Sequence, residues 1–206
     1  ESLDELLEES EPGNKLKIAE IKKITRQGME GEISFSESLS RRIDLLDATN
    51  ENIKKTVQKL RDKVSDSIIK NSDFIKKNKD HIYIISSGFH EMIDPIVLEY
   101  GILKKNIYAN SFIFNKSMRI VGYDEKNPLS TSKGKVKILK KLRLKGTTHI
   151  IGDGFTDFEI KKEGHADYFY LFTENIKRKS LIKNADFSIK SFDQFIDIVK
   201  WKNFHT

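Results

Sequence analysis

Hydrophobic residues recur every three or four positions over about the first third of the chain. Leu39, Ile43 and Leu46 show this spacing, which is typical of amphipathic helices. No segment of this part alternates hydrophobic and polar residues as a half-buried strand does. We therefore predict a small helical module over residues 1–71.

The helical pattern is interrupted at residues 28–35, GMEGEISF, where two glycines favour a loop. Ser34 or Ser36 is the expected N-cap of the helix that follows. The module should therefore consist of several helices joined by short loops.

Short β-branched runs alternate with helical stretches from about residue 72 onward. The strand candidates are HIYIIS, HIIG and YFYLF, at residues 81–86, 149–152 and 168–172. Strands that alternate with helices predict a mostly parallel sheet covered by helices on both faces. We therefore predict a Rossmann-like α/β core over residues 72–206.

One segment of the predicted core has a different pattern. NSFIFNKSMRIVGY, residues 110–123, alternates on both sides of Asn115 and Lys116. This arrangement predicts a β-hairpin beside the parallel sheet.

Composition narrows the class of protein. The 206 residues suffice for one sizeable domain with a small satellite, and the lack of cysteine excludes disulfides and thiolate metal sites. No apolar run reaches the roughly 20 residues that span a bilayer, so we expect a cytoplasmic protein without a membrane partner. Because the chain begins with Glu1 and not Met, we expect the numbering to start inside a longer protein.

The net charge of +6 raises the question of a nucleic-acid partner. The most basic stretch, residues 133–146, carries Val136, Leu139 and Leu142 at helical spacing, which is typical of an amphipathic helix with a solvated basic face. No aromatic residues are interleaved there for base stacking. Nucleic acid is therefore the weaker interpretation, and the sequence leaves open whether the protein is a homodimer.

Residues 150–160, IIGDGFTDFEI, place two carboxylates where a predicted strand meets a glycine turn. A carboxylate in such a place needs a cation, and Asp153 is placed as a ligand of Mg²⁺, which takes one or two protein carboxylates. Asp157, about one helical turn further on, can orient Asp153 or a metal-bound water. A plain helix cap at Thr156 or Asp157 is the structural alternative.

Residues 84–90, IISSGFH, form a candidate anion site. Serine hydroxyls and glycine amides lie where a strand ends and a helix begins, and the N–H groups of a helix start favour a negative ligand. Ser86 is expected to donate to a phosphate oxygen, with the amides of Ser87 and Gly88 beside it. An ordinary helix cap is the alternative here as well.

Lys133, in the segment TSKGK, is the third candidate. A lysine at a helix start opposes the helix dipole, which indicates a nearby anion such as an acyl phosphate or a carboxylate nucleophile. A surface lysine is the alternative.

Taken in order, a strand that ends in serine, a lysine and a strand that ends in GDGxxD resemble the haloacid dehalogenase superfamily of phosphohydrolases. Residues 28–46 closely resemble the cap segment of phosphoserine phosphatases, with its Met-x-Gly-x-x-x-Phe-x-x-Ser-Leu-x-x-Arg pattern. The leading ESLDEL resembles the stretch that follows the first motif of these enzymes. The resemblance covers nearly the whole chain and makes residues 1–71 the expected cap.

The resemblance implies a role for each candidate residue of the core. These roles are phosphate binding by Ser86, Ser87 and Gly88, stabilisation of a phosphoaspartate by Lys133, and Mg²⁺ binding by Asp153 with support from Asp157.

In the cap, the resemblance implies that Arg42 binds the carboxylate of the substrate and that Glu1 binds its ammonium group. Met29 and Phe35 would close over the site and exclude water. Without the resemblance, Arg42 would be interpreted as a surface arginine, and Met29 and Phe35 as core residues. Two residues depart from the family pattern: Thr156 stands where the family usually has asparagine, and Ser87 stands where glycine is common. These departures affect the expected identity of the substrate more than the type of reaction.

The first motif of the family, DxDx(T/V), supplies the nucleophilic aspartate and the general acid/base aspartate at the end of the first core strand. Neither aspartate is present in the 206 residues, so we expect this strand to lie upstream of residue 1. A sheet without its interior strand would keep an unfilled apolar slot, which is costly.

The leading hypothesis is a Mg²⁺-dependent phosphatase for O-phospho-L-serine, acting in serine biosynthesis through an aspartyl-phosphate intermediate. One alternative is a related phosphatase or phosphotransferase for another small phosphorylated metabolite. The other is a non-catalytic binding domain in which the aspartate motif is truly absent.

Overall fold

The computed structural model describes residues 2–30 and 32–203, and their side chains except those of residues 29, 30 and 201–203. By their contacts the residues form two compact units. Unit 1 comprises Glu1–Lys63 and Asn78–Gly134, and unit 2 comprises Val64–Lys77 and Lys135–Thr206. The predicted division into a cap and a core at residues 71 and 72 stays a prediction.

Unit 1 begins with four helices, namely α1 (Ser2–Ser10), α2 (Lys15–Glu30), α3 (Phe35–Asp44) and α4 (Asn50–Arg61). These four helices confirm the prediction of a helical first part. Ser34 caps α3, as predicted, because its hydroxyl accepts a hydrogen bond from the N–H group of Glu37 at 3.1 Å.

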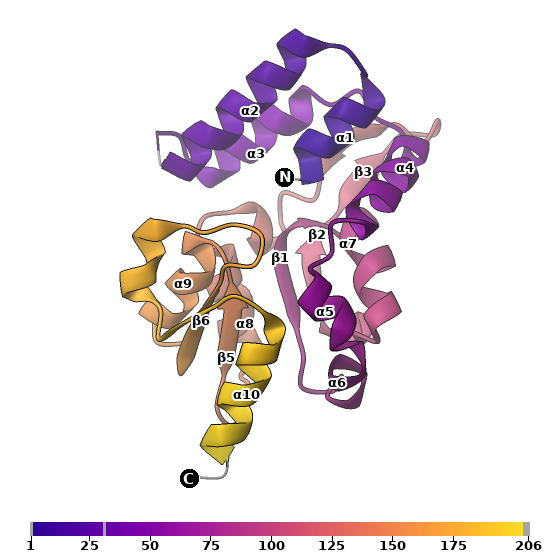
Figure 1. Cartoon of the computed structure of the whole chain (residues 1–206). Coiled ribbons are helices and arrows are strands. Elements are labelled where there is room, and N and C mark those ends of the chain that lie inside the picture. Colours follow the sequence, from indigo (N-terminus) through magenta and orange to yellow (C-terminus); the bar gives the residue numbers. More distant parts are fainter. Residues whose placement is uncertain (1, 31, 204–206) are drawn as a thin grey trace. The chain divides into compact units, whose positions relative to one another are not determined.

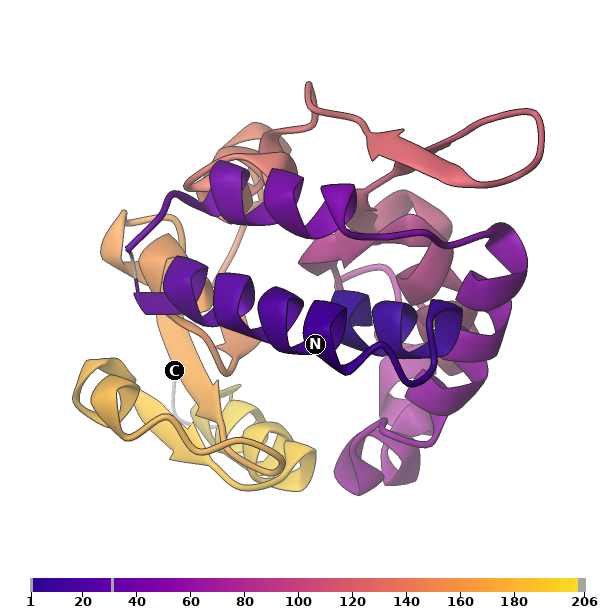
Figure 2. The same ribbon diagram turned by 90° about the horizontal axis from the view of Figure 1, so that it is seen from above.

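The predicted loop at residues 28–35 is wrong at its start, since α2 continues through Gly28 to Glu30. A Cβ atom on Gly28 would overlap the side chain of Ser38 on α3. Figures 1 and 2 show α2 and α3 running side by side. The glycine therefore permits close helix packing here instead of breaking the helix.

The strands of unit 1 form a parallel pair and a hairpin (Figure 1). The parallel strands are β1 (Ile84–Phe89) and β2 (Ile107–Asn110), joined through α7 (His90–Val97) and the 3-10 turns Leu98–Tyr100 and Lys104–Asn106. The predicted hairpin is confirmed as β3 (Phe112–Phe114) and β4 (Ile120–Tyr123), which pair antiparallel. A further 3-10 turn, η3 (Pro128–Ser130), follows it.

The core of unit 1 joins the first helices to α7 and the hairpin. Leu6 and Leu7 of α1 are fully buried, and the ring of Phe89 stacks on that of Phe112 with 3.8 Å between the centroids. Because each large side chain that leaves water contributes roughly 1.5–3 kcal/mol, these contacts fix the end of β1 against the hairpin.

Unit 2 has a parallel sheet in the order β5-β6-β7, with helices packed on it. Its strands are β5 (His149–Gly152), β6 (Tyr168–Phe172) and β7 (Phe187–Ile189). Its helices are α5 (Asp66–Lys70), α6 (Ser72–Lys77), α8 (Gly134–Leu142, with Gly134 in unit 1), α9 (Phe155–Lys162), η4 (Lys179–Asn184) and α10 (Phe192–Asn203). The predicted α/β class with parallel strands is thereby confirmed.

Strands β1 and β5 each have one edge that no described strand pairs with. In β6, which has a partner on both sides, Phe169, Tyr170 and Leu171 are completely buried. Ile84 and Ile85 of β1 are only partly buried, as are the isoleucines of β5. A strand with partly buried apolar side chains and an unpaired edge is a place where another strand can pair.

Candidate active site

The loop after β5 is shaped by Gly152 and Asp157. The Asp157 carboxylate lies over Gly152, where a Cβ atom would overlap it, and one of its oxygens accepts a hydrogen bond from the N–H group of Gly154 at 3.1 Å. Asp157 thus reaches back to the loop, as predicted, and also satisfies a backbone donor at the start of α9. Capping and support of the loop are therefore performed by the same side chain.

The second oxygen of Asp157 binds Lys135. The Nζ–Oδ1 distance is 2.6 Å, and the two side chains keep only 15% and 13% of their exposure. Separation of a nearly buried ion pair costs several kcal/mol, because each partner left alone would be an uncompensated buried charge. The pair therefore fixes the position of the Asp157 carboxylate. Sequence reasoning considered Lys133 and missed Lys135, although its place at the start of a helix was the same signal.

Asp153 lies beyond the carboxyl end of β5, and Arg178 lies beyond the end of the neighbouring strand β6. The guanidinium group approaches Asp153 Oδ2 with its Nε at 3.4 Å and its Nη2 at 3.3 Å. Lys177 and Lys179, which flank Arg178, are exposed. Of these three basic residues Arg178 is the one that contacts Asp153, and no sequence signal singled it out.

The irregular last part of β1, called here the Ser86–Gly88 loop, is neutral and rich in hydrogen-bond donors. Ser86, Ser87 and Gly88 lie where the pairing of β1 with β2 shifts its register, Phe89 separates them from α7, and all three are partly buried. The N–H group of Gly88 donates to Ser86 Oγ at 3.0 Å, so it is used within the loop. The Ser86 hydroxyl accepts this bond and keeps its own hydrogen for another acceptor.

Lys133 lies directly before α8 in a left-handed backbone conformation, with φ at +57°. Such a conformation costs a residue with a side chain roughly 1–2 kcal/mol, and strained residues cluster at functional sites. The next residue, Gly134, packs so closely on Pro128 and Leu129 that a Cβ atom would overlap their backbone. The turn is therefore held in shape by packing from η3.

Arg42 of α3 is buried, with 7% exposure, and its Nε donates to the carbonyl of Ser38 at 3.1 Å. The interpretation as a surface arginine, which the sequence alone favours, is wrong. Phe35 at the start of α3 is partly buried against the core of unit 1. Glu1 and the side chain of Met29 lie outside the described part of the chain.

The predicted site residues fall into two groups. Unit 1 contains Ser86, Ser87, Gly88, Lys133, Phe35 and Arg42; unit 2 contains Asp153, the exposed Thr156, and Asp157. Within unit 2 the loop geometry brings Asp153, Asp157 and Gly154 together. The convergence of Ser86, Lys133 and Asp153 on one ligand stays a prediction.

Comparison with known proteins places this geometry in a family. A phosphoserine phosphohydrolase-like protein from Francisella tularensis is 30% identical, and its crystal structure matches with a TM-score of 0.83 over 97% of this chain and 93% of that chain. This chain belongs to the phosphoserine phosphatase-like family of the haloacid dehalogenase superfamily. No protein-family model matches it.

Two curated relatives bear the name of the same family. The chloroplastic phosphoserine phosphatase of Arabidopsis thaliana is 34% identical over 84% of this chain, and the phosphoserine phosphatase of Drosophila melanogaster is 28% identical over 95% of it. The chain spans 60% of the Arabidopsis relative and 72% of the Drosophila relative.

Phosphatases of the haloacid dehalogenase superfamily generally use Mg²⁺. Among the described residues no group of three or more His, Cys, Asp and Glu side chains is arranged to hold a metal ion. Asp153 fits the ion as a single ligand, because it is a hard oxygen donor with 46% of its side chain exposed. The remaining ligands would have to come from water, the substrate and residues outside the described part.

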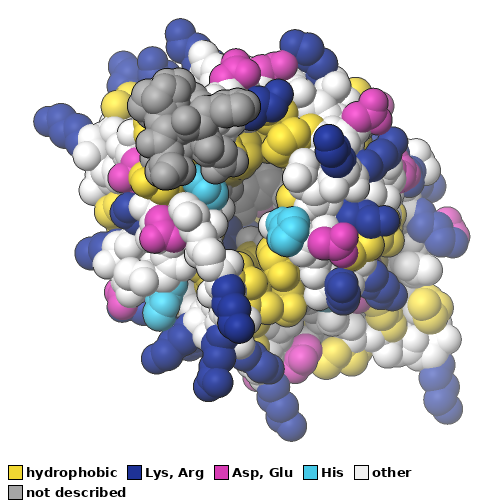
Figure 3. Space-filling model, turned by 90° about the horizontal axis from the view of Figure 1, so that it is seen from below, with side chains coloured by type: hydrophobic (Ala, Val, Ile, Leu, Met, Phe, Trp, Pro, Cys, Tyr) yellow, Lys and Arg dark blue, Asp and Glu magenta, His cyan; other side chains and the backbone are white. Residues whose placement is uncertain are grey.

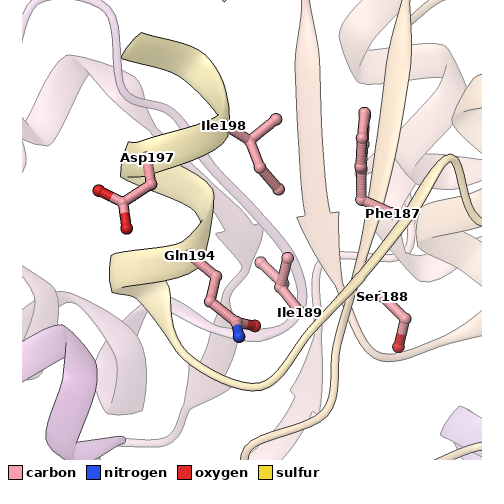
Figure 4. Close-up of a pocket in the computed structure, with 6 residues that line it drawn as sticks. All are labelled: Phe187, Ser188, Ile189, Gln194, Asp197 and Ile198. Atoms are coloured by element: carbon pink, nitrogen blue, oxygen red, sulfur yellow. The ribbon is translucent and has the colours of Figure 1, made fainter. Parts of the chain in front are cut away.

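A surface pocket of about 360 Å³ in unit 2 does not belong to this loop (Figure 4). Its lining residues, on β7 and α10, are Phe187, Ser188, Ile189, Gln194, Asp197 and Ile198. No predicted site residue is among them. The close-up also shows the carboxylate of Asp197 pointing away from Phe187, so the pocket is lined mainly by neutral groups.

Two further observations concern the surface charges and the helices. On the face drawn in Figure 3, Lys and Arg side chains are spread out, with Asp and Glu side chains among them. Within residues 2–30 and 32–203, no helix is long and apolar enough to cross a bilayer.

Proposed function

We propose that the protein is a Mg²⁺-dependent phosphomonoester hydrolase that releases phosphate from O-phospho-L-serine. The observation that carries the proposal is the loop after β5, where Asp153 extends beyond a parallel strand while Lys135 and Gly154 hold Asp157 beside it. The similarity to phosphoserine phosphatases over most of the chain supports the substrate.

Some of the core residues would bind the phosphate of the substrate, and one would bind the metal ion. Ser86 donates its hydroxyl to the phosphate, next to the backbone of Ser87 and Gly88, and Lys133 neutralises the charge that develops during transfer. Asp153 would hold Mg²⁺, which supplies Lewis-acid stabilisation of the phosphoryl oxygens when bound. Asp157 keeps the loop in shape, and the exposed Thr156, in the first turn of α9, would contact the substrate.

The nucleophile is the first aspartate of a DxDx(T/V) motif, which the 206 residues do not contain. Its carboxylate attacks phosphorus, and the bond to the serine oxygen breaks. A second aspartate two residues later gives that oxygen a proton and then takes one from the water that hydrolyses the acyl phosphate. Partly buried isoleucines beside an edge without a described partner, in β1 and again in β5, support a further strand that would carry this motif.

The substrate is recognised as a zwitterion. The planar guanidinium of Arg42 binds its carboxylate, Glu1 binds its ammonium group, and Met29 and Phe35 cover the site. Arg42 is buried, with 7% exposure, so its guanidinium would meet the carboxylate in a place that is shielded from water, where a charged hydrogen bond is strong.

The test is phosphate release by the protein expressed from its complete gene, with and without Mg²⁺. We expect hydrolysis of phosphoserine that disappears when EDTA removes the metal. If no phosphomonoester is hydrolysed, the enzymatic proposal fails; if sugar phosphates are better substrates, only the substrate is wrong. A gene without DxDx(T/V) upstream of Glu1 would instead favour a non-catalytic binding domain.

Substitution of Arg42 by alanine separates phosphoserine from another small phosphorylated metabolite. Loss of a charged hydrogen-bonding partner should raise KM for phosphoserine about 10- to 100-fold and leave KM for phosphoethanolamine, which has no carboxylate, nearly unchanged. An equal rise for both substrates would contradict the assignment of Arg42.

We infer further that the protein acts in the cytoplasm, in serine biosynthesis, and binds neither nucleic acid nor membrane. Light scattering of the purified protein measures whether it is a homodimer.

A further inference from the structure

The side chain of Asn110 joins two loops that the proposed function uses. Asn110 is the last residue of β2 and is completely buried. Its amide nitrogen donates to the carbonyl of Ser87 at 2.9 Å and to that of Leu129 at 3.3 Å. Ser87 belongs to the Ser86–Gly88 loop, the irregular last part of β1, and Leu129 belongs to η3, which leads to Lys133. One buried amide thus holds the backbone of both loops.

The turn that Asn110 holds has a firm structure of its own. Asn127 donates to the carbonyl of Ala109 at 2.7 Å and accepts from the N–H group of Leu129 at 3.0 Å. Ser130 is 3% exposed, and its hydroxyl lies 2.8 Å from the carbonyl of Asn127. A rigid turn of this kind also fixes the backbone position of the residues that follow it, including the strained Lys133.

The oxygen of the Asn110 amide differs from the nitrogen in its bonding. The Oδ1 atom of Asn110 is buried and makes no hydrogen bond to any described residue. A buried acceptor without a donor destabilises a fold, and most native structures contain few of them. The fold therefore keeps an asparagine here although its oxygen is unfavourable, which indicates that the two hydrogen bonds donated by its nitrogen are what matters.

We propose that Asn110 is a positioning residue whose amide sets the spacing between the Ser86–Gly88 loop and Lys133, and thereby the rate of phosphoryl transfer. The inference rests on the proposed function, which makes Ser86 and Lys133 ligands of the phosphate. A shift of about 1 Å in a catalytic group can lower a rate about 100-fold. Binding of the ground-state substrate, which has many other contacts, should change much less.

Asn106 provides a matched control at the opposite end of β2. It is also buried, with 4% exposure, and its amide nitrogen donates to the carbonyls of Lys79 and Ile82, both at 3.1 Å. Because β1 and β2 are parallel, these bonds lie at the amino ends of the strands, away from the Ser86–Gly88 loop. The two asparagines have the same chemistry and differ in what they hold.

The experiment compares Asn110→Ser with Asn106→Ser in the full-length protein. We expect kcat for phosphoserine to fall about 10- to 100-fold in the first variant with less than a threefold change in KM, and kcat to stay within twofold in the second. Both variants should lose similar thermal stability. If Asn110→Ser does not fold, Asn110→Asp, which keeps the shape and faces both carbonyls with an oxygen, takes its place.

Hydrogen exchange of the amides at residues 124–134 gives a readout that does not need activity. Exchange should become faster in the Asn110 variant and not in the Asn106 variant. Equal kcat values in the two variants, a change confined to KM, or equal exchange of this segment would overturn the inference. If the wild-type protein hydrolyses no phosphomonoester, the proposed function fails, while the exchange measurement still decides whether Asn110 positions the turn.

Discussion

Two loops of the molecule share one construction and differ in charge. At the end of β1, the segment Ser86–Gly88 is followed by Phe89 and then by α7; at the end of β5, the segment Gly152–Gly154 leads into α9. The first loop offers hydroxyl and amide groups, and burial raises the pKa of Glu91 in the first turn of α7, which favours its neutral form. The second loop holds two carboxylates, each with a cation beside it.

The comparison shows that a strand, a glycine and a helix provide the same backbone geometry in both places. The side chains on that backbone determine which ligand it suits. A loop of hydroxyl and amide groups in front of a helix start suits an anion, because the N–H groups and the positive end of the helix dipole favour negative charge there. Asp153 and Asp157 would repel an anion but suit a divalent cation. The same local construction can therefore carry groups that suit an anion in one place and groups that suit a cation in another.

The largest effect should follow from making the second loop as neutral as the first. Asp153→Asn removes the charge that would hold Mg²⁺ while it preserves the shape of the side chain. We expect kcat/KM for phosphoserine to fall about 10²- to 10³-fold, since metal stabilisation of a transition state supplies several kcal/mol. Activity assays over a range of Mg²⁺ concentrations measure it; undiminished activity would contradict the role of Asp153.

The next effect concerns stability. Lys135→Met leaves the carboxylate of Asp157 without its cation at a place that is 9% exposed. Loss of one partner of a buried pair should lower the free energy of unfolding by about 3 kcal/mol, measured by denaturant titration. Lys140→Met, on the exposed side of the same helix, is the control and should change it by less than about 0.5 kcal/mol. Equal stability of the two variants would show that the pair contributes nothing.

A smaller effect is expected from Arg178→Met. The guanidinium competes with a divalent cation for Asp153 Oδ2, so its removal should tighten Mg²⁺ binding about three- to tenfold. Calorimetric titration measures the affinity directly, and Lys177→Met is the control from the same segment. Weaker Mg²⁺ binding in the Arg178 variant would instead mean that the arginine helps to orient Asp153.

The smallest effect tests the neutral loop. A carboxyl group whose pKa is raised on folding stabilises the fold below its ordinary value of about 4.5, and this contribution is lost as pH rises through the raised pKa. Glu91→Gln keeps the acceptor for the N–H group of Phe112 and cannot ionise. The variant should have the same free energy of unfolding as the wild type near pH 4 and a higher one at pH 7, measured by denaturant titration at both pH values. Parallel stability curves over this range would contradict the assignment.

Local patterns revealed most of the fold. The runs at residues 149–152 and 168–172 became β5 and β6, and the hairpin and the helix after Gly134 formed as predicted. The short strands β2 and β7 escaped notice, because four and three residues without turn signals on both sides leave too little periodicity to detect. Strand β1 starts at Ile84 instead of residue 81, and at its other end the pairing of Phe89 with Asn110 carries it through the Ser-Ser-Gly segment.

The candidate site was predictable where its residues stand in motifs and unpredictable where it depends on contacts across the fold. Asp153 and Ser86 were found from strand ends. Lys135, Arg178 and Asn110 act through partners 19 or more residues away in sequence, at distances that no local pattern encodes. The burial of Arg42 is likewise a result of helix packing that includes the contact between Gly28 and Ser38.

The unpaired edges of β1 and β5 suggest a way to make the protein switchable. Each edge is a row of backbone donors and acceptors that a separate apolar peptide can occupy in trans, as in fragment complementation. If the strand that carries the proposed nucleophile were supplied as such a peptide, activity would depend on its concentration, and the same chain would serve as a split reporter.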